Sequence, residues 1–334
     1  MPPPRRSLVT GVAGFIGSHV AEALLAAGHE VCGIDDLSGG FTDNVPPGVR
    51  FYHGSALDEA LVERVFREHR PAAVFHLAAY AAEGLSHFIR VFNYSNNVIG
   101  SMTLVNAAVR HDVGTFLFTS SIAVYGALAG HAREDMNPRP EDPYGIAKLA
   151  VELDLEAARR MFGLEYVIVR PHNVYGERQH IGDRYRNVIG IFMNQIMRGE
   201  PMTIFGDGRQ TRAFTYIGDV APAIARAIDL PAARGQVFNL GADEPTTLND
   251  LATAVADAMG SPRVVVHLPP RHEVVHAVAD HSRAAEVLGY RASTPLRDGL
   301  RTMAEWARRV GPREPSHRSS IEIERGLPES WKRT

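Results

Sequence analysis

A glycine-rich turn near the N-terminus is the feature that most constrains the fold of this chain. Gly11, Gly14 and Gly17 follow the short apolar run 7–10 and precede a helical pattern over about residues 15–27. Glycines at this spacing let a strand turn sharply into a helix, and they let backbone amides approach a pyrophosphate at the helix N-terminus. Ordinary strand-to-helix turns share the spacing, so the rest of the chain has to decide between the two interpretations.

Strand and helix patterns alternate through the first half of the chain. Short apolar runs predict strands, and apolar residues recurring every three to four positions predict the helices between them. The strand patterns lie at 7–10, 30–35, 50–52, 73–77, 115–119 and 166–170, and the helix patterns at about 15–27, 58–69, 88–111 and 144–162. This alternation is typical of a doubly wound parallel sheet, the Rossmann-type α/β fold.

The pattern loosens after Pro171, where shorter elements carry glycine and proline punctuation, as in Gly206-Asp207-Gly208. Such punctuation indicates loops and short strands. We therefore expect a dinucleotide-binding Rossmann domain over residues 1–171 and a smaller α/β substrate lobe over residues 172–334. Some segments of the lobe are expected to return to the first domain.

The composition excludes several other classes of protein. A chain of 334 residues with 45% apolar residues buries a large core. Its net charge is −3 and it has no basic run interleaved with aromatic residues, so we expect no nucleic-acid partner. No apolar stretch approaches the roughly 20 residues that span a bilayer, and Cys32 is the only cysteine, which favours the cytoplasm. The 15 histidines form no compact ligand pattern, so no metal site is expected.

An acidic residue at the end of the second strand pattern strengthens the dinucleotide interpretation. Asp35 lies 18 residues after Gly17, where a carboxylate can bind both ribose hydroxyls. The same charge repels a 2′-phosphate, so NAD is favoured over NADP. Asp36 is the other candidate for this contact, and its alternative role is to cap the following loop.

Tyr144 and Lys148 form the second signature, with Ser121 as the third candidate for a catalytic role. The phenol and the ammonium are four residues apart, hence on one face of a helix. A neighbouring cation lowers the pKa of a phenol from about 10 and makes it a usable proton acceptor for an alcohol. Amphipathic helices often carry such a pair by chance, and a serine at a strand end is often a turn residue, but downstream of a dinucleotide turn we favour the functional role.

The chain resembles the extended short-chain dehydrogenase/reductase superfamily and, within it, the NAD-dependent nucleotide-sugar epimerases similar to UDP-glucose 4-epimerase. Ordered motifs along almost the whole chain carry the resemblance. Besides the glycine turn and the Tyr144–Lys148 pair, these are His76-Leu77-Ala78-Ala79 and the segments 96–100, 120–126, 170–176 and 206–212. The resemblance implies NAD as cofactor and a UDP-sugar as substrate.

The resemblance also implies a set of cofactor-binding residues. They are Gly11, Gly14, Phe15, Ile16, Gly17, Asp35, Asp36, Ser55, Ala56, Leu77, Ala78, Ala79, Asn97, Tyr144, Lys148 and Pro171. Ser55 and Ala56 are expected at the adenine, and Pro171 beside the nicotinamide. Ser55 departs from the family, in which an aspartate is usual at this position.

The resemblance implies substrate contacts as well. They come from Ser121, Tyr144, Asn173, Asn187, Val188, Arg212, Arg271 and Glu273. The two arginines are expected to neutralise the sugar diphosphate, because guanidinium groups bind phosphate oxygens bidentately. Two departures qualify this set: the Arg271-His272-Glu273 segment is one residue shorter than usual, and Ala213 replaces an acid often found after the first arginine.

The reaction is expected to be a C4 epimerisation through a transient 4-keto sugar. Related dehydratases and decarboxylases commonly carry carboxylates ahead of the Val-Tyr-Gly motif, where this chain has Ile122 and Ala123. Without an acid there to assist a leaving group, the simplest fate of the keto sugar is to take the hydride back on its other face. A nucleotide-sugar decarboxylase or dehydratase stays as the enzymatic alternative, and an NAD-sensing binding module as the non-enzymatic one.

Sequence features point to different hexoses. Ala277 falls where related epimerases use a bulky residue to exclude an N-acetyl group, so its small side chain favours UDP-N-acetylglucosamine. His180, Arg184 and Arg186 form a basic loop that suits a C6 carboxylate, as in UDP-glucuronate, although a solvated surface is the simpler interpretation of such a loop. Relatives also suggest that the helices at 88–111 and 144–162 pair with those of a second subunit, so we expect a homodimer.

Overall fold

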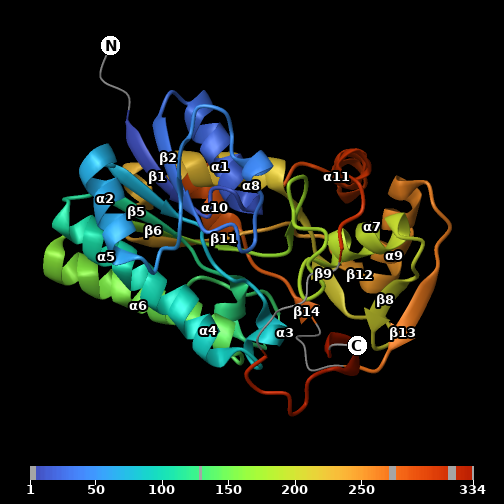
Figure 1. The fold of residues 1–334 in the computed structure, drawn as a ribbon. Coiled ribbons are helices and arrows are strands. Elements are labelled where there is room, and N and C mark those ends of the chain that lie inside the picture. The colour runs from blue at the N-terminus through green and yellow to red at the C-terminus, as the bar shows by residue number, and fades with distance from the viewer. Residues whose placement is uncertain (1–4, 128–129, 271–275, 315–320, 333–334) are drawn as a thin grey trace.

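The computed structural model describes residues 5–127, 130–270, 276–314 and 321–332, which form two packed parts (Figure 1). The larger part is a parallel sheet with helices on both faces. The smaller part gathers α7, α9 and α11 around short strands at the other end of the molecule. None of the described helices is both long and apolar enough to cross a membrane.

The central sheet has seven parallel strands in the order β11-β6-β5-β4-β1-β2-β3. The bounds are β1 Arg6–Thr10, β2 Glu30–Asp35, β3 Arg50–His53, β4 Ala73–His76, β5 Thr115–Thr119, β6 Tyr166–Pro171 and β11 Gln236–Leu240. The order reverses between β1 and β4, and open α/β sheets bind ligands at the carboxyl ends of the strands beside such a reversal. The prediction of a doubly wound parallel sheet is therefore confirmed.

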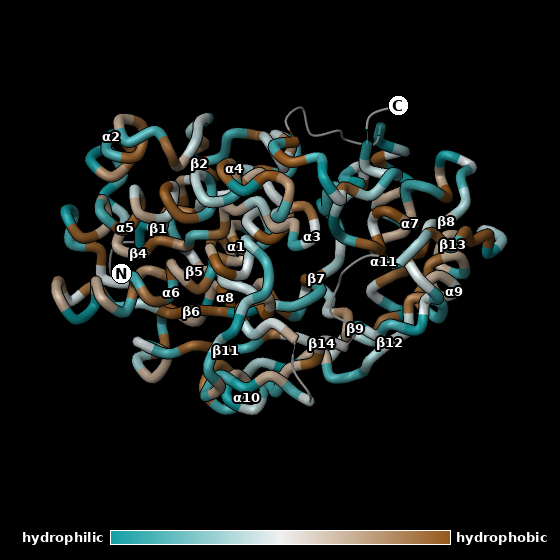
Figure 2. Tube along the Cα trace, turned by 90° about the horizontal axis from the view of Figure 1, so that it is seen from below, coloured by the Kyte–Doolittle hydropathy of each residue, from teal (hydrophilic) through white to brown (hydrophobic). Residues whose placement is uncertain are grey.

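Each face of the sheet buries its own apolar cluster, because alternate residues of a strand point to opposite faces. Val9, Phe75 and Leu117 pack against α1 (Phe15–Ala26), α8 (Ile217–Ala227) and α10 (Ser282–Leu288). Their neighbours Leu8, Val74 and Phe116 pack against α2 (Glu59–His69), α5 (Gly100–Arg110) and α6 (Pro143–Phe162). Figure 2 shows the hydrophobic residues along the strands and the hydrophilic ones in the outer loops. Burial on both faces explains why these strands are apolar throughout rather than alternating.

The helix boundaries follow local capping chemistry. The Asp142 side chain accepts from the Gly145 amide at 2.9 Å, Pro143 occupies the first turn of α6, and Gly163 ends that helix in a left-handed conformation. The helix expected at 88–111 differs from the prediction. It is divided into α4 (Arg90–Tyr94), a π-helical turn (Ser95–Ile99) and α5, and the short α3 (Glu83–Ser86) precedes it. Asn97, which is buried in this turn, hydrogen-bonds the preceding loop.

The smaller part is built around the buried face shared by three helices, α7 (Val188–Met197), α9 (Leu248–Met259) and α11 (Leu296–Val310). Its paired strands are β8 (Met202–Phe205) with β13 (Val265–Leu268), β9 (Thr211–Ala213) with β12 (Pro245–Thr247) and β14 (His276–Ala277), and β7 (Val174–Tyr175) with β10 (Thr215–Tyr216). The chain passes between the two parts more than once, since β11, α8 and α10 belong to the layers of the large sheet.

Candidate active site

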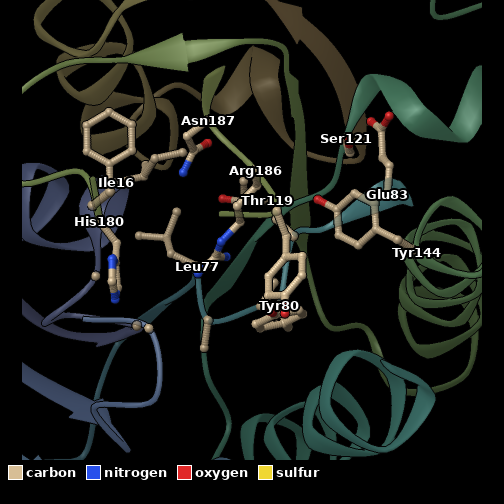
Figure 3. Close-up of a pocket in the computed structure, with 18 of the residues that line it drawn as sticks. Ile16, Leu77, Tyr80, Glu83, Thr119, Ser121, Tyr144, His180, Arg186 and Asn187 are labelled. Atoms are coloured by element: carbon tan, nitrogen blue, oxygen red, sulfur yellow. The ribbon is translucent and has the colours of Figure 1, made fainter. Parts of the chain in front are cut away.

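A cavity of about 510 Å³ lies at the carboxyl ends of six sheet strands, where the smaller part covers them. Thr10, Asp35, His76, Thr119 and Pro171 reach it from the ends of their strands. The smaller part contributes the segment before α7, strand β8, Arg212 of β9 and the start of α9. Figure 3 shows side chains from both parts pointing into this space.

The glycine turn lines one end of the cavity, and its close packing excludes side chains. Gly11 has a φ of 72°, and a Cβ added to it would lie 2.8 Å from the Ala78 backbone nitrogen. A Cβ at Gly17 would lie 1.9 Å from the Gly11 carbonyl oxygen. The turn opens directly into α1, whose described first turn carries no acidic residue. Its backbone amides therefore suit a pyrophosphate at the positive end of the helix.

Asp35 is held beside the turn by backbone donors. Its two carboxylate oxygens accept from the Ala13 amide at 3.0 Å and the Leu37 amide at 2.8 Å. Burial raises the pKa of Asp35, and these two hydrogen bonds oppose that rise. A carboxylate has lone pairs beyond the two in use, so it can still accept from a ribose diol. Asp36 also lines the cavity, but it is exposed and accepts from the Ser38 amide at 2.9 Å, which is the loop-capping alternative.

Most of the other expected cofactor residues also line the cavity. They are Phe15, Ile16, Ser55, Ala56, Leu77, Ala78, Ala79 and Pro171. Asn97 is not among the residues that line the cavity. Its amide accepts from the Tyr80 backbone nitrogen at 2.9 Å and donates to the Tyr80 carbonyl at 3.2 Å, while its neighbour Asn96 lines the cavity. Asn97 is thus placed to support the loop of Tyr80.

Tyr144, Lys148 and Ser121 meet at the other end of the cavity. Asp142 and Pro143 fix the start of α6, so Tyr144 lies in its first turn and Lys148 one turn later. The Lys148 ammonium donates to the Thr119 carbonyl at 2.7 Å and lies 5.8 Å from the centre of the Tyr144 ring. Figure 3 shows Tyr144 and Ser121 together on one wall, with Glu83 beside them.

The protonation of Tyr144 differs from the sequence-based expectation. We expected Lys148 to lower the pKa of the phenol, but burial raises the pKa of Tyr144, and the opposing contributions come from the hydrogen bond with Ser121 and the charge of Arg186. Burial also lowers the pKa of Lys148 to about 7. Moving either ionised group away from water costs free energy, and for both groups this cost outweighs the effect of nearby charges.

A buried ion pair behind Lys148 was missed in the sequence. Glu152 lies one further turn along α6 and forms a bidentate pair with Arg170 of β6, with Nε 2.9 Å from Oε1. Arg170 also donates to the Tyr125 hydroxyl at 2.7 Å. The Glu152 charge raises the pKa of Lys148 against the effect of burial. The four-residue spacing from Lys148 was the available signal.

The expected substrate residues are only partly described. Asn173, Asn187, Val188 and Arg212 line the cavity, and the two asparagines have positive φ angles of 45° and 66°. Arg271 and Glu273 lie outside the described residues. Strand β14 sets Ala277 opposite Arg212 in register, but the side chain of Ala277 also lies outside the description.

The basic loop before α7 is not a solvated surface. Arg186 packs against Tyr80, with the guanidinium 4.9 Å from the ring centre, and its Nε donates to Asp183 at 2.6 Å. Arg184 donates to the Ser330 carbonyl, and the His180 ring packs 4.9 Å from that of Phe41. The solvated interpretation of this loop is therefore wrong for its two arginines, because Arg186 contacts Asp183 and Tyr80 and Arg184 donates to Ser330.

Several other cavity residues carried no recognisable sequence signal. Tyr80, Glu83, His87 and Glu141 line the cavity, yet none belongs to a motif with a defined spacing. His76 does lie in a motif, and its role here is structural. Its two ring nitrogens bond the hydroxyls of Thr10 at 2.7 Å and Ser101 at 2.8 Å, and burial lowers its pKa to about 3.

Comparison with known proteins now identifies the family. Residues 7–241 match the model of the NAD dependent epimerase/dehydratase family. The chain belongs to this family. It is 36% identical to the UDP-glucose 4-epimerase of Mycolicibacterium smegmatis over 311 residues, which cover 91% of this chain and 98% of that protein.

Solved structures agree with this placement. The UDP-glucose 4-epimerase of Thermotoga maritima, solved with UDP-glucose, superposes with a TM-score of 0.86 at 37% identity, covering 91% of this chain and 99% of that one. The Thermus thermophilus enzyme, in complex with NAD, gives 0.84 at 35% identity over 90% and 98%. The family resemblance predicted from the motifs is confirmed, and NAD is the cofactor of the family.

Proposed function

We propose that this protein interconverts the C4 epimers of a UDP-hexose of the UDP-glucose/UDP-galactose type through a transient 4-keto intermediate. The observation that carries the proposal is one cavity with a dinucleotide-type glycine turn and Asp35 at one end and Tyr144, Lys148 and Ser121 at the other. The names of the M. smegmatis and T. maritima relatives support the same activity.

Burial alone keeps the Tyr144 phenol protonated, so in the proposed mechanism the positive charges of Lys148 and of the bound nicotinamide would lower its pKa before it takes the proton of the C4 hydroxyl and later returns it. Bound NAD would supply the hydride acceptor in its oxidised form and, after the keto sugar has rotated to present its other face, the hydride donor in its reduced form. Ser121 shares the proton through its hydrogen bond to Tyr144, and that bond lowers the pKa of the phenol. Lys148 holds positive charge one helical turn below the ring. The glycine turn and Asp35 hold the pyrophosphate and the ribose, with the other cavity-lining cofactor residues along the dinucleotide.

The segment before Tyr125 supports epimerisation over loss of a group from the sugar. Ser121 caps the 3-10 turn Ile122–Tyr125 and accepts from the Ala123 amide at 3.1 Å. By the family resemblance, Ile122 and Ala123 stand where related dehydratases and decarboxylases carry acids. We propose that the keto sugar therefore has no general acid in this segment. Glu83 and Glu141 line the cavity elsewhere, so the mass of the product is a necessary control.

The sugar nucleotide is proposed to lie against the smaller part. Asn173, Asn187, Val188 and Arg212 reach the cavity from that side and supply amides and a cation for a diphosphate and a hexose. By the family resemblance Arg271 and Glu273 join them, although both lie outside the described residues.

A direct assay tests this function. UDP-glucose, UDP-glucuronate and UDP-N-acetylglucosamine are each incubated with the protein without added reductant, and the products are followed by NMR and mass spectrometry. We expect a C4 epimer of unchanged mass and no net NADH. Net NADH accumulation would assign the protein to the dehydrogenases, and loss of water or carbon dioxide would assign it to the dehydratases or decarboxylases.

We also propose a cytoplasmic homodimer. Exposed apolar side chains gather on the helices at one side of the sheet: Val91 on α4, Ile99 in the π-helical turn, and Leu153, Met161 and Phe162 on α6. Cys32, the single cysteine, is buried and free, which suits a reducing compartment. Leu153→Glu is expected to give a monomer by light scattering, whereas the same change at Val264, an exposed apolar residue far from these helices, leaves the dimer intact. A monomeric wild-type protein would contradict the proposal.

A further inference from the structure

Arg186 reaches from the smaller part into the middle of the cavity. It lies in the segment that leads into α7, and only 16% of its side chain is exposed. Figure 3 shows its guanidinium between Leu77 and Tyr80, with Tyr144 and Ser121 to one side and Ile16 and His180 to the other. An arginine in this place stands between the two ends of the proposed NAD site.

The surroundings of Arg186 fix which portion of the cavity it faces. A Cβ added at Gly39 would lie 3.1 Å from its Nη2, so the guanidinium touches the loop that follows Asp35. That loop packs directly on the glycine turn, because a Cβ at Gly40 would lie 2.3 Å from the Ala13 carbonyl and 2.8 Å from the Gly14 amide. On the other side the charge of Arg186 acts on Tyr144. The guanidinium is therefore between the ribose-binding aspartate and the catalytic phenol, opposite the glycine turn.

We propose that Arg186 clamps the pyrophosphate of NAD from the side opposite the glycine turn. In a dinucleotide the pyrophosphate joins the two riboses, and these riboses are assigned here to Asp35 at one end and to Tyr144 and Lys148 at the other. The inference rests on the proposed function only in taking this orientation of NAD. It adds a cofactor contact that the glycine motif does not contain, supplied by the smaller part of the molecule.

The chemistry of the guanidinium fits this role. Nε donates to Asp183, whose other oxygen accepts from the Tyr185 amide at 2.9 Å, so the carboxylate is fixed and orients the arginine. No hydrogen bond from either η nitrogen to another described residue accompanies the one from Nε to Asp183. A guanidinium presents such N–H groups in the fork geometry that matches phosphate oxygens.

A contact between the parts also suits an epimerase. In such a cycle NAD is regenerated at each turnover, so retaining it is useful, whereas a dehydrogenase has to exchange it. The glycine turn offers backbone amides from the large part alone, and among the described cavity-lining residues the lysines and arginines are Lys148, Arg184, Arg186 and Arg212. Of these, Arg186 is the one in contact with the loop on the glycine turn. Its loss is therefore expected to weaken NAD binding itself.

The test is a binding titration of the full chain after bound NAD has been removed. NAD, ADP-ribose and adenosine are titrated into wild type, Arg186→Gln and Arg186→Lys by isothermal calorimetry. Losing charge-assisted hydrogen bonds is expected to raise the Kd of NAD and of ADP-ribose by roughly ten- to a hundredfold in Arg186→Gln. The Kd of adenosine, which has no phosphate, is expected to stay unchanged. Arg186→Lys keeps the charge but loses the fork, so an intermediate loss is expected.

Arg178→Gln is the matched control. Arg178 belongs to the same segment and pairs with Glu22 at 2.9 Å, but it does not line the cavity. This variant is expected to bind NAD and ADP-ribose like wild type. Thermal unfolding of each variant checks the fold, and if Arg186→Gln does not fold, Arg186→Lys supplies the comparison.

Two results would overturn the inference. One is an unchanged Kd for NAD and ADP-ribose in the folded Arg186 variants. The other is unchanged NAD binding combined with a selective loss of UDP-glucuronate turnover, which would assign Arg186 to a C6 carboxylate. Because the titration needs no turnover, its outcome is separate from that of the proposed function. If the wild-type protein binds NAD through Arg186 but epimerises no UDP-hexose, the proposed function is contradicted and the role of Arg186 in NAD binding is kept.

Discussion

The nucleotide end and the sugar end of the cavity are built by different means. At the nucleotide end, parallel strands deliver backbone amides and one carboxylate, with Gly11, Gly17 and Asp35 in positions that the sheet itself defines. At the sugar end, Asn173 holds a left-handed conformation between β6 and the two-residue strand β7, and Asn187 holds one at the start of α7. At the nucleotide end the backbone itself forms the site, so few residue types are tolerated at its glycine positions. At the sugar end loop side chains form the site, so their positions depend on packing with distant segments.

The strongest effect is expected at the glycine turn. Gly17→Ala places a methyl group 1.9 Å from the Gly11 carbonyl, so the turn cannot keep its shape. We expect NAD binding and epimerase activity to fall below detection, measured by the NAD content of the purified protein and by the NMR assay. Gly100→Ala is the control, because a Cβ there meets only ordinary contacts from 3.6 Å outward. Normal NAD content in Gly17→Ala would show that the turn is not rigid.

Tyr144→Phe separates the chemical step from cofactor binding. Removing a general acid–base is expected to lower kcat by about 10²- to 10⁴-fold, while NAD stays bound because the glycine turn and Asp35 are untouched. Steady-state kinetics and the NAD content of the protein measure the two effects. Tyr52→Phe is the control, since its hydroxyl only donates to Glu68 at 2.8 Å on the surface. Retention of wild-type kcat would assign the proton transfer to another group.

Arg212→Gln tests the sugar end. A lost charge-assisted contact to the diphosphate is expected to raise KM for the UDP-sugar by roughly ten- to a hundredfold, with a smaller change in kcat and none in the Kd of NAD. Arg209→Gln makes the same change in the same segment at a side chain that is 87% exposed and outside the cavity. A loss of NAD affinity in Arg212→Gln would contradict the assignment of Arg212 to the sugar nucleotide rather than to NAD.

Glu152→Gln is expected to have the smallest effect on catalysis, but it also leaves Arg170 without its buried partner, so thermal unfolding is measured alongside activity. The Glu152 charge raises the pKa of Lys148, which burial lowers to about 7, so the variant lowers that pKa further. Since Lys148 acts as the cation, activity falls as pH rises through its pKa, and this alkaline limb is expected to move to lower pH. A shift of one pH unit makes the loss on that limb about tenfold. The measurement is the rate across the pH range, and Glu156→Gln on the exposed face of α6 is the control. An alkaline limb that stays at the wild-type pH in Glu152→Gln would contradict this role of Glu152.

The same division explains what the sequence alone could predict. The alternation of strand and helix patterns along the chain indicated the doubly wound sheet, and the glycine spacing with Asp35 indicated the nucleotide end of the cavity. Both signals follow from local backbone geometry. Three properties depended on tertiary contacts and were not predicted: the raised pKa of Tyr144 comes from burial, Asn97 turns to the Tyr80 backbone, and Arg186 is covered by Asp183 and Tyr80. Tyr80 and Arg186 lie far apart in sequence, so no local pattern joins them.

In the proposed reaction, hydride leaves C4 of the sugar and returns to the same carbon within one cavity. The most direct measurement uses a UDP-hexose carrying deuterium at C4, converted by wild-type protein in the presence of excess unlabelled NADH and analysed by NMR. We expect a C4 epimer that retains the deuterium fully. Deuterium lost to the NADH pool or to solvent would contradict it.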